Sequence, residues 1–275
     1  MRRSLAGVGM LVALMGGLAP ACAREGVEVG GNSAFSQLVP AAQVESSAGQ
    51  QYQQLLRQAH EKGALAGADH PQLQRLRRIA KSLIPLSHDW NSRAREWRWE
   101  VNLIGSKQIN AFCMPGGKII FYTGILERLQ LSDDEVAMVM GHEIAHALRE
   151  HARERMGKSA ATNIGAGLLS QVLGLGSLGQ TLTNYGAELL TLKFSRENET
   201  DADLVGLELA ARAGFDPRAS ITLWQKMSAA NSGAPPQWLS THPSGTSRID
   251  ELERSLPKVM PLYERARSAG VPTPQ

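Results

Sequence analysis

The sequence predicts an α+β protein that is mainly helical and carries one small β-sheet. Two observations support this fold class: apolar residues recur at helical spacing through most of the chain, and they alternate with polar residues only around residues 97–122. The chain has 275 residues, 43% of them hydrophobic and 20% charged, so it can form a substantial core and is too mixed for a polytopic membrane protein. Its formal net charge of +3 gives no indication of a nucleic-acid partner.

The first 23 residues have the composition of an export signal. Two arginines precede an uncharged apolar stretch from Leu5 to Leu18, and small residues then surround Cys22. This pattern predicts a signal peptide over residues 1–23 that directs the protein across the inner membrane of a bacterium. Lipidation at Cys22 and ordinary cleavage among the small residues are alternative endings, so we expect a periplasmic protein with or without a lipid anchor. An uncleaved helix or anchor is a third alternative.

The rest of the chain divides into three parts by composition. Residues 24–48 are rich in Gly, Ala, Ser and Gln without a clear period, which predicts a flexible tether. Residues 49–256 contain the periodic elements and are expected to form one folded domain. Residues 257–275 are punctuated by proline and are expected to form a short C-terminal tail. Cys113 has no cysteine partner within this domain, so we expect a buried free thiol.

Two helices are predicted before the sheet. Residues 50–62 carry apolar residues at helical spacing. A second helix is expected after Asp69, with Pro71 in its first turn, an apolar face that ends near Leu83, and Pro85 as its terminator.

Three short strands are predicted next. Residues 97–103 alternate between apolar and polar side chains, and residues 109–112 and 118–122 are short apolar runs. Two glycine-containing turns, at residues 105–107 and 115–117, separate the strands. Because both connections are tight, the pattern predicts a small meander.

A long helix follows the strands. Ser132 and Glu135 form the sequence signature of a capping box, and the apolar period continues to about Met156. Another helix is predicted over residues 196–213, where Gly214 ends it.

The long helix contains the clearest chemical motif, GHEIAHALREH over residues 141–151. His142 and His146 are four residues apart and therefore share one helix face, from which both imidazoles can reach a single cation. Glu143 lies next to the first histidine and is the expected general base. This HExxH pattern on a helix is typical of a catalytic zinc site. His151 turns off that face and is expected to lie in solvent.

A catalytic zinc needs a third protein ligand. Residues 195–206 offer Glu197 and Glu199, each with an aspartate four residues later, and spacing alone does not choose between them. The helix faces favour Glu199, because its face continues through small residues, whereas that of Glu197 reaches the charged Glu208. Asp203, one turn after Glu199, is expected to hydrogen-bond the far nitrogen of a ligand histidine.

At this point the chain resembles the zinc metallopeptidase family that includes HtpX, the CaaX prenyl endopeptidases and the Oma-like proteases. It is most similar to the bacterial periplasmic BepA and LoiP type. Five segments match in order: NAFCMPGGKIIFYTGIL (110–126), HEIAH (142–146), SRENETDAD (195–203), AGFDP (213–217) and STHPSGTSRI (240–249). The resemblance implies a zincin fold of the gluzincin-like kind, one Zn²⁺ ion per chain, a zinc metallopeptidase domain over residues 49–256 and Glu199 as the third ligand.

The resemblance also places His242 near the metal. His242 would act there either as a catalytic residue that stabilises the oxyanion or as a ligand in the open zinc position that keeps the enzyme latent. Arg196 is a further candidate for a place beside the metal ligands. Residues 159–187, which carry no charge, are expected to form amphipathic or buried helices near the site, with a membrane span or surface-lying hairpin as the alternative.

These features predict a zinc endopeptidase of the bacterial cell envelope that cleaves misfolded or unassembled envelope proteins. Unfolded or extended substrates would lie along an edge strand near the turn at residues 115–117. Membrane contact is expected through Cys22 or residues 159–187. The alternatives are a latent-protease chaperone or assembly factor for outer-membrane proteins, and a structural lipoprotein with a vestigial site.

Overall fold

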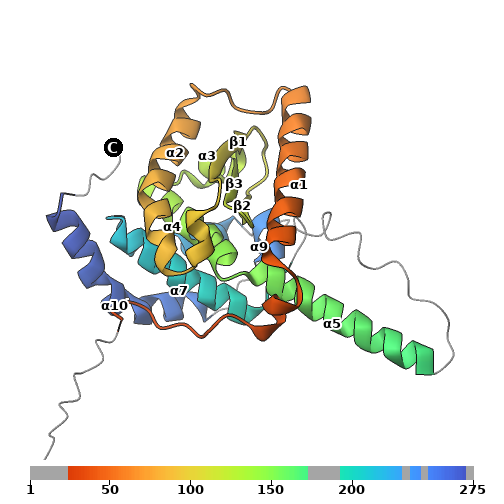
Figure 1. Ribbon diagram of the computed structural model, residues 1–275. Coiled ribbons are helices and arrows are strands. Elements are labelled where there is room, and N and C mark those ends of the chain that lie inside the picture. Colours follow the sequence, from red (N-terminus) through yellow and green to blue (C-terminus); the bar gives the residue numbers. More distant parts are fainter. Residues whose placement is uncertain (1–23, 173–192, 231–235, 243–246, 271–275) are drawn as a thin grey trace, which may run out of the picture.

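Figure 1 shows the computed structural model, which describes residues 24–172, 193–230, 236–242 and 247–270. The predicted architecture is confirmed in outline, since helices make up most of the described chain and three strands form one small sheet. The elements are η1 (Ala34–Leu38), α1 (Ala41–Glu61), α2 (Pro71–Leu83), η2 (Ile84–Asp89), η3 (Ser92–Arg95), β1 (Glu100–Ile104), β2 (Ala111–Met114), β3 (Lys118–Tyr122), α3 (Thr123–Leu129), α4 (Asp133–Leu148), α5 (His151–Val172), α7 (Arg196–Arg212), α8 (Ala219–Ala229), α9 (Gln237–Thr241) and α10 (Arg248–Ser268).

The sheet has the strand order β1-β3-β2, so the predicted meander is wrong. β3 pairs in parallel with β1 and antiparallel with β2. β2 runs opposite to β1 but is not its neighbour in the sheet. The segment between them packs against the start of α3, where the N–H and C=O of Ser106 both hydrogen-bond the Thr123 hydroxyl. A Cβ on Gly124 would lie 2.4 Å from the carbonyl oxygen of Gln108. This close contact holds residues 105–110 away from β1, so that the position beside β1 is taken by β3.

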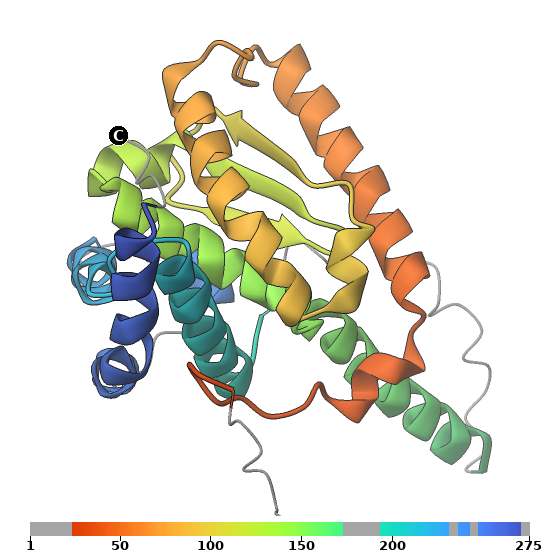
Figure 2. The same cartoon turned by 60° about the vertical axis from the view of Figure 1, so that its left-hand side comes forward.

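The alternation of the strands places different residues on the two faces of the sheet. Val101, Leu103 and Phe121 belong to the main core with α2 and α4, whereas Ile104 and Ile120 face the opposite way and pack with Tyr52 of α1. Figures 1 and 2 show the sheet between α1 and these two helices. Both faces of the sheet are therefore covered, which explains the continuous apolar run of its central strand β3.

The helix predicted from Ser132 to Met156 is two helices. α4 ends at Leu148, and Glu150 adopts a left-handed backbone with φ 57°. Salt bridges stabilise this corner on both sides of the break, from Arg149 to Asp201 and from Arg153 to Glu150. α5 then starts at His151 in a new direction.

Residues 24–48 are packed on the domain, so the expectation of a flexible tether is wrong. The buried carboxylate of Glu208 accepts a hydrogen bond of 2.8 Å from the Val27 N–H and forms a 2.7 Å salt bridge with Arg24. η1 lies against α5, and α1 begins at Ala41. We call residues 24–39 the N-terminal strap. A buried charge needs partners, and the strap supplies them.

The C-terminal tail predicted from Pro257 is also ordered, because α10 runs through Pro257 and Pro261 to Ser268. Both prolines lie on its exposed face. The opposite face buries Leu252, Val259 and Leu262. Burial of that apolar stripe offsets the hydrogen bonds that the two prolines cannot donate.

In the part of the chain that the structure describes, no helix combines the length and the apolar character needed to cross a membrane. The predicted signal peptide lies outside the described residues. Within residues 159–187, the described part continues as α5 up to Val172.

Candidate metal centre

The site is built on two helices whose backbones touch. α4 starts at a capping box, in which the Ser132 hydroxyl accepts from the Glu135 N–H and the Glu135 carboxylate accepts from the Ser132 N–H. α7 crosses α4 where two glycines meet: a Cβ on Gly141 would lie 2.7 Å from the Gly206 carbonyl oxygen, and one on Gly206 would lie 2.6 Å from the His142 nitrogen. Only glycine at both positions allows this approach, which brings Glu199 of α7 opposite the histidines of α4.

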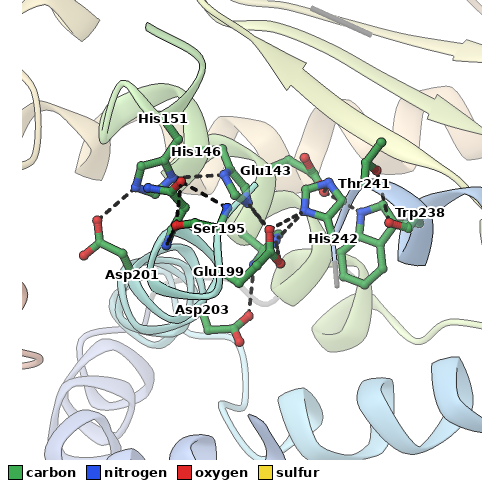
Figure 3. Close-up of polar contacts among 12 residues, drawn as sticks. Glu143, His146, His151, Ser195, Glu199, Asp201, Asp203, Trp238, Thr241 and His242 are labelled. Carbon is green, nitrogen blue, oxygen red and sulfur yellow. Dashed lines mark hydrogen bonds and ion pairs between the residues drawn. The ribbon is translucent and has the colours of Figure 1, made fainter. Parts of the chain in front are cut away.

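Four side chains converge in the space between the helices. One ligand atom from each of His142, His146, Glu199 and His242 lies within 4.8 Å of the others, and all four residues are buried. Nε2 of His146 is 3.0 Å from Nε2 of His142, and the Glu199 oxygens lie 3.4 and 3.6 Å from these two nitrogens. Figure 3 shows Glu199 between His146 and His242.

The electrostatics of the cluster favour a neutral His146 and an ionised Glu199. Burial holds the pKa of His146 well below its usual value. Burial alone would raise the pKa of Glu199, but its contacts with His146 and His242 outweigh that effect and hold the pKa far below the usual range. Neutral imidazole nitrogens and one carboxylate form the donor set that a catalytic zinc ion binds.

Asp203 and Arg248 surround the donors on the α7 side. Nδ1 of His142 lies 2.9 Å from Oδ1 of Asp203. The Arg248 guanidinium binds both oxygens of Asp203, donates to Oε2 of Glu199 across 2.8 Å and stacks on Trp224. The arginine therefore pairs with two buried carboxylates and fixes their orientation.

The prediction that Arg196 lies beside the metal ligands is wrong. Arg196 is exposed in the first turn of α7, whereas the arginine that contacts the site carboxylates is Arg248. Arg248 lies in the matched segment STHPSGTSRI, which contained the signal. A buried arginine at the first position of a helix is not apparent from periodicity.

The expectation that His151 lies in solvent is also wrong. Its side chain is 3% exposed. Because α4 breaks after Leu148, the turn at Glu150 directs His151 back toward the ligands. Nδ1 of His151 lies 3.0 Å from Nδ1 of His146, and its Nε2 lies 3.1 Å from Oδ2 of Asp201 (Figure 3).

The short helix α9 brings two side chains to Glu143. Nε1 of Trp238 donates a 2.6 Å hydrogen bond to Oε1 of Glu143. Nε2 of His242 lies 3.6 Å from the same oxygen, and its Nδ1 lies 3.1 Å from Oε1 of Glu199. Burial lowers the pKa of His242, but the negative charges of Glu143 and Glu199 outweigh it, so the pKa is raised.

Residues 71–256 match the model of peptidase family M48. The chain belongs to this family. The mitochondrial metalloendopeptidase OMA1 of Schizosaccharomyces pombe is 37% identical over 192 residues, which cover 69% of this chain and 54% of the relative. OMA1 of Arabidopsis thaliana is 40% identical over 157 residues, covering 57% of this chain and 31% of the relative.

The chain is also similar to a bacterial protease. The β-barrel assembly-enhancing protease of Escherichia coli is 32% identical over 172 residues, which cover 58% of this chain and 35% of that protein. The chain thus spans between about a third and about half of the length of these three relatives. M48 metallopeptidases use zinc, and the donor set of this M48 chain fits a single zinc ion.

A narrow cavity of about 40 Å³ opens beside the M48 site. One wall is the edge strand β2 with Cys113, and the other walls include Glu143, His146 and Phe194. Cys113 is a buried free thiol, as predicted, and burial raises its pKa. The cavity connects the donor cluster with β2, which within the described residues lies at the edge of the sheet.

Proposed function

We propose that this protein is a zinc-dependent endopeptidase. The observation that carries the proposal is the convergence of His142, His146 and Glu199 with the carboxylate of Glu143 beside them. The chemistry that zinc supplies at such a site is Lewis-acid polarisation of a water molecule and of the scissile carbonyl. The two histidines and Glu199 would hold the ion, and His142 is oriented by Asp203.

Glu143 is the proposed general base. Trp238 holds its Oε1, which directs Oε2 to accept a proton from the attacking water and to deliver that proton to the leaving amine. Desolvation inside the buried site strengthens this proton transfer, because few water molecules compete for the carboxylate.

His242 has two proposed roles that depend on its position. In this structure its Nδ1 lies among the donors, 3.2 Å from Nε2 of His142 and 3.1 Å from Oε1 of Glu199. That arrangement supports a latent form. When a substrate displaces it, the imidazole would donate a hydrogen bond to the developing oxyanion.

The proposed substrates are unfolded or extended proteins. A substrate that adds to the free edge of β2 makes main-chain hydrogen bonds, so recognition depends little on its sequence. We place this activity in the bacterial periplasm, with Cys22 as the candidate lipid anchor. The composition of residues 1–23 supports this location.

A peptidase assay tests this function directly. The full-length protein, matured in a bacterial host, is incubated with reduced, unfolded casein, and products are identified by mass spectrometry. We expect cleavage that a chelator abolishes, that zinc restores and that Glu143→Gln lowers by at least ~100-fold. Cleavage that survives both the chelator and the substitution would contradict the proposal.

A second candidate is a latent-protease chaperone or assembly factor for outer-membrane proteins. The position of His242 among the donors and the narrow cavity favour it. The name of the Escherichia coli relative associates that protein with β-barrel assembly. An assembly phenotype that persists in the Glu143→Gln variant would support this function over proteolysis.

A further inference from the structure

His151 is a buried histidine that the proposed mechanism does not use. It lies at the start of α5, between His146 on one side and Asp201 on the other, and both contacts have hydrogen-bond distances of 3.0 and 3.1 Å. Asp201 is also held by Arg149, whose Nε donates across 2.6 Å. These residues form a continuous chain of polar contacts from a metal ligand to the edge of α7.

The protons in this chain can be assigned from the chemistry of the ligand. His146 faces the other donors through Nε2, so its Nδ1 carries the proton when Nε2 binds a cation. That N–H donates to Nδ1 of His151. Since a neutral imidazole has one donor and one acceptor, His151 must hold its own proton on Nε2, which donates to Asp201. Each hydrogen bond fixes the next tautomer.

The carboxylate at the end of the chain is paired with a cation. Oδ2 of Asp201 forms a salt bridge of 2.6 Å with Nε of Arg149 and lies 3.1 Å from Nε2 of His151. A negative charge therefore stabilises the partial positive charge that His146 gains when it binds a cation.

The two histidines of α4 are thus supported in parallel but different ways. His142 contacts the carboxylate of Asp203 on α7 directly. His146 is connected to the carboxylate of Asp201 on the same helix through His151. His146 lies one turn further along α4 than His142. The imidazole of His151 lies between His146 and Asp201 and spans the distance that separates them. On its other face the ring of His146 stacks on Phe194, with centroids 4.0 Å apart. The ring has little freedom to choose another orientation.

We infer that His151 and Asp201 are positioning residues that fix the tautomer and orientation of His146 and thereby strengthen zinc binding. The inference rests on the proposed function in that it takes His146 as a zinc ligand. Loss of such a supporting hydrogen bond typically weakens metal affinity by ~10–100-fold. The effect should appear in binding itself and should not depend on the assay of peptidase activity.

The test measures the zinc dissociation constant of the full chain by competition with a chromophoric chelator. His151→Leu removes the acceptor, and we expect a dissociation constant higher by ~10–100-fold. His151→Asn places an amide oxygen near the position of Nδ1 and should recover part of the affinity, because His146 regains an acceptor. Asp201→Asn keeps His151 and removes the charge, and should give an intermediate loss.

Glu154→Gln is the matched control. Glu154 lies one turn after His151 on α5 and bonds Asn198 and Lys158 without contacting His146, so its loss should leave the zinc affinity unchanged. The visible spectrum of the cobalt-loaded protein reports the ligand geometry, and we expect it to change in His151→Leu but not in Glu154→Gln. Thermal melting of the apo-proteins separates loss of folding from loss of binding.

The possible outcomes distinguish this inference from the proposed function. Zinc affinities of His151→Leu and Asp201→Asn that equal that of the parent would overturn the inference and leave the proposed function intact. A parent protein that binds no zinc would overturn both. If His151→Leu does not fold, His151→Asn and Asp201→Asn still decide the question.

Discussion

The indole N–H of Trp238 and the carboxylate of Glu143 form a 2.6 Å hydrogen bond between two buried side chains. The indole also stacks on His242, with ring centroids 4.9 Å apart. A single residue of α9 therefore contacts both the proposed base and the proposed oxyanion group. This contact links the orientation of the base to the position of α9.

Trp238→Phe tests that link. The substitution keeps most of the apolar surface but removes the donor, so Oε1 of Glu143 loses its partner and the carboxylate loses its orientation. We expect kcat to fall by about 10-fold or more with little change in KM. Trp97→Phe is the control, because Trp97 donates a similar 3.0 Å hydrogen bond to Glu45 at a distance from the site. Equal kcat in the two variants would contradict the assigned role.

Arg248→Met should destabilise the protein through unpaired charge. The substitution leaves the buried carboxylates of Asp203 and Glu199 without their cation, which typically costs ~3–5 kcal/mol. Urea unfolding of the apo-protein measures the change. Arg254→Met on the same helix removes an exposed pair with Glu251 and should change the free energy of unfolding by less than ~1 kcal/mol. Similar losses in both variants would contradict the prediction.

Gly206→Ala should separate α4 from α7. The new methyl group would lie 2.6 Å from the backbone nitrogen of His142, so the helices must move apart. We expect a loss of ~1–3 kcal/mol in the free energy of unfolding and weaker zinc binding, because Glu199 moves away from the histidines. Gly49→Ala in α1 meets no atom within 4 Å and should be neutral or stabilising. Unimpaired zinc affinity in Gly206→Ala would show that the close contact is not needed.

Adjacent carboxylates at the start of α4 should respond to pH in opposite directions. Burial raises the pKa of Glu135, but Lys226 and the Ser132 N–H outweigh it, so the net pKa is lowered. Its contribution to stability is therefore present above the unfolded-state pKa of ~4.3 and is lost as the pH falls below it. The decrease in the free energy of unfolding caused by Glu135→Gln should be largest near neutral pH and smaller in acid.

Asp134→Asn should change the free energy of unfolding with pH in the opposite direction to Glu135→Gln. Burial raises the pKa of Asp134 despite the hydrogen bond from the Asp216 N–H. The parent therefore gains stability relative to Asp134→Asn below the raised pKa and loses that gain as the pH rises through it. Urea unfolding of both apo-variants across acidic pH measures the two slopes. Slopes of the same sign would contradict the pKa assignments.

The structure brings together the residues that local sequence patterns assigned to the centre of the candidate site. The four-residue spacing of His142 and His146 and the capping box at Ser132 depend only on helix geometry, which the sequence encodes directly. The choice of Glu199 over Glu197 used the small residues on one face of the helix, and the structure places Gly206 at the crossing with α4. Glu199 is among the converging donors, and Glu197 is exposed.

Features that depend on one backbone angle or on long-range packing could not be predicted. His151 contacts His146 because Glu150 adopts a left-handed conformation, which is uncommon for a glutamate. The strand order depends on where the chain after β1 packs, and not on the strands themselves. The helix through Pro257 persists because its other face is buried, which outweighs local propensity.

The buried carboxylate of Glu208 links α7 to the N-terminal strap. The family match starts at residue 71, yet this carboxylate on α7 is fully buried and takes partners from the N-terminal strap as well as from Arg212. A fragment that begins at residue 71 would lack Arg24 and Val27. Of the partners of Glu208 described above, only Arg212 would remain. The family match therefore excludes residues that contact this buried charge, and expression for structural work should begin at or before Arg24.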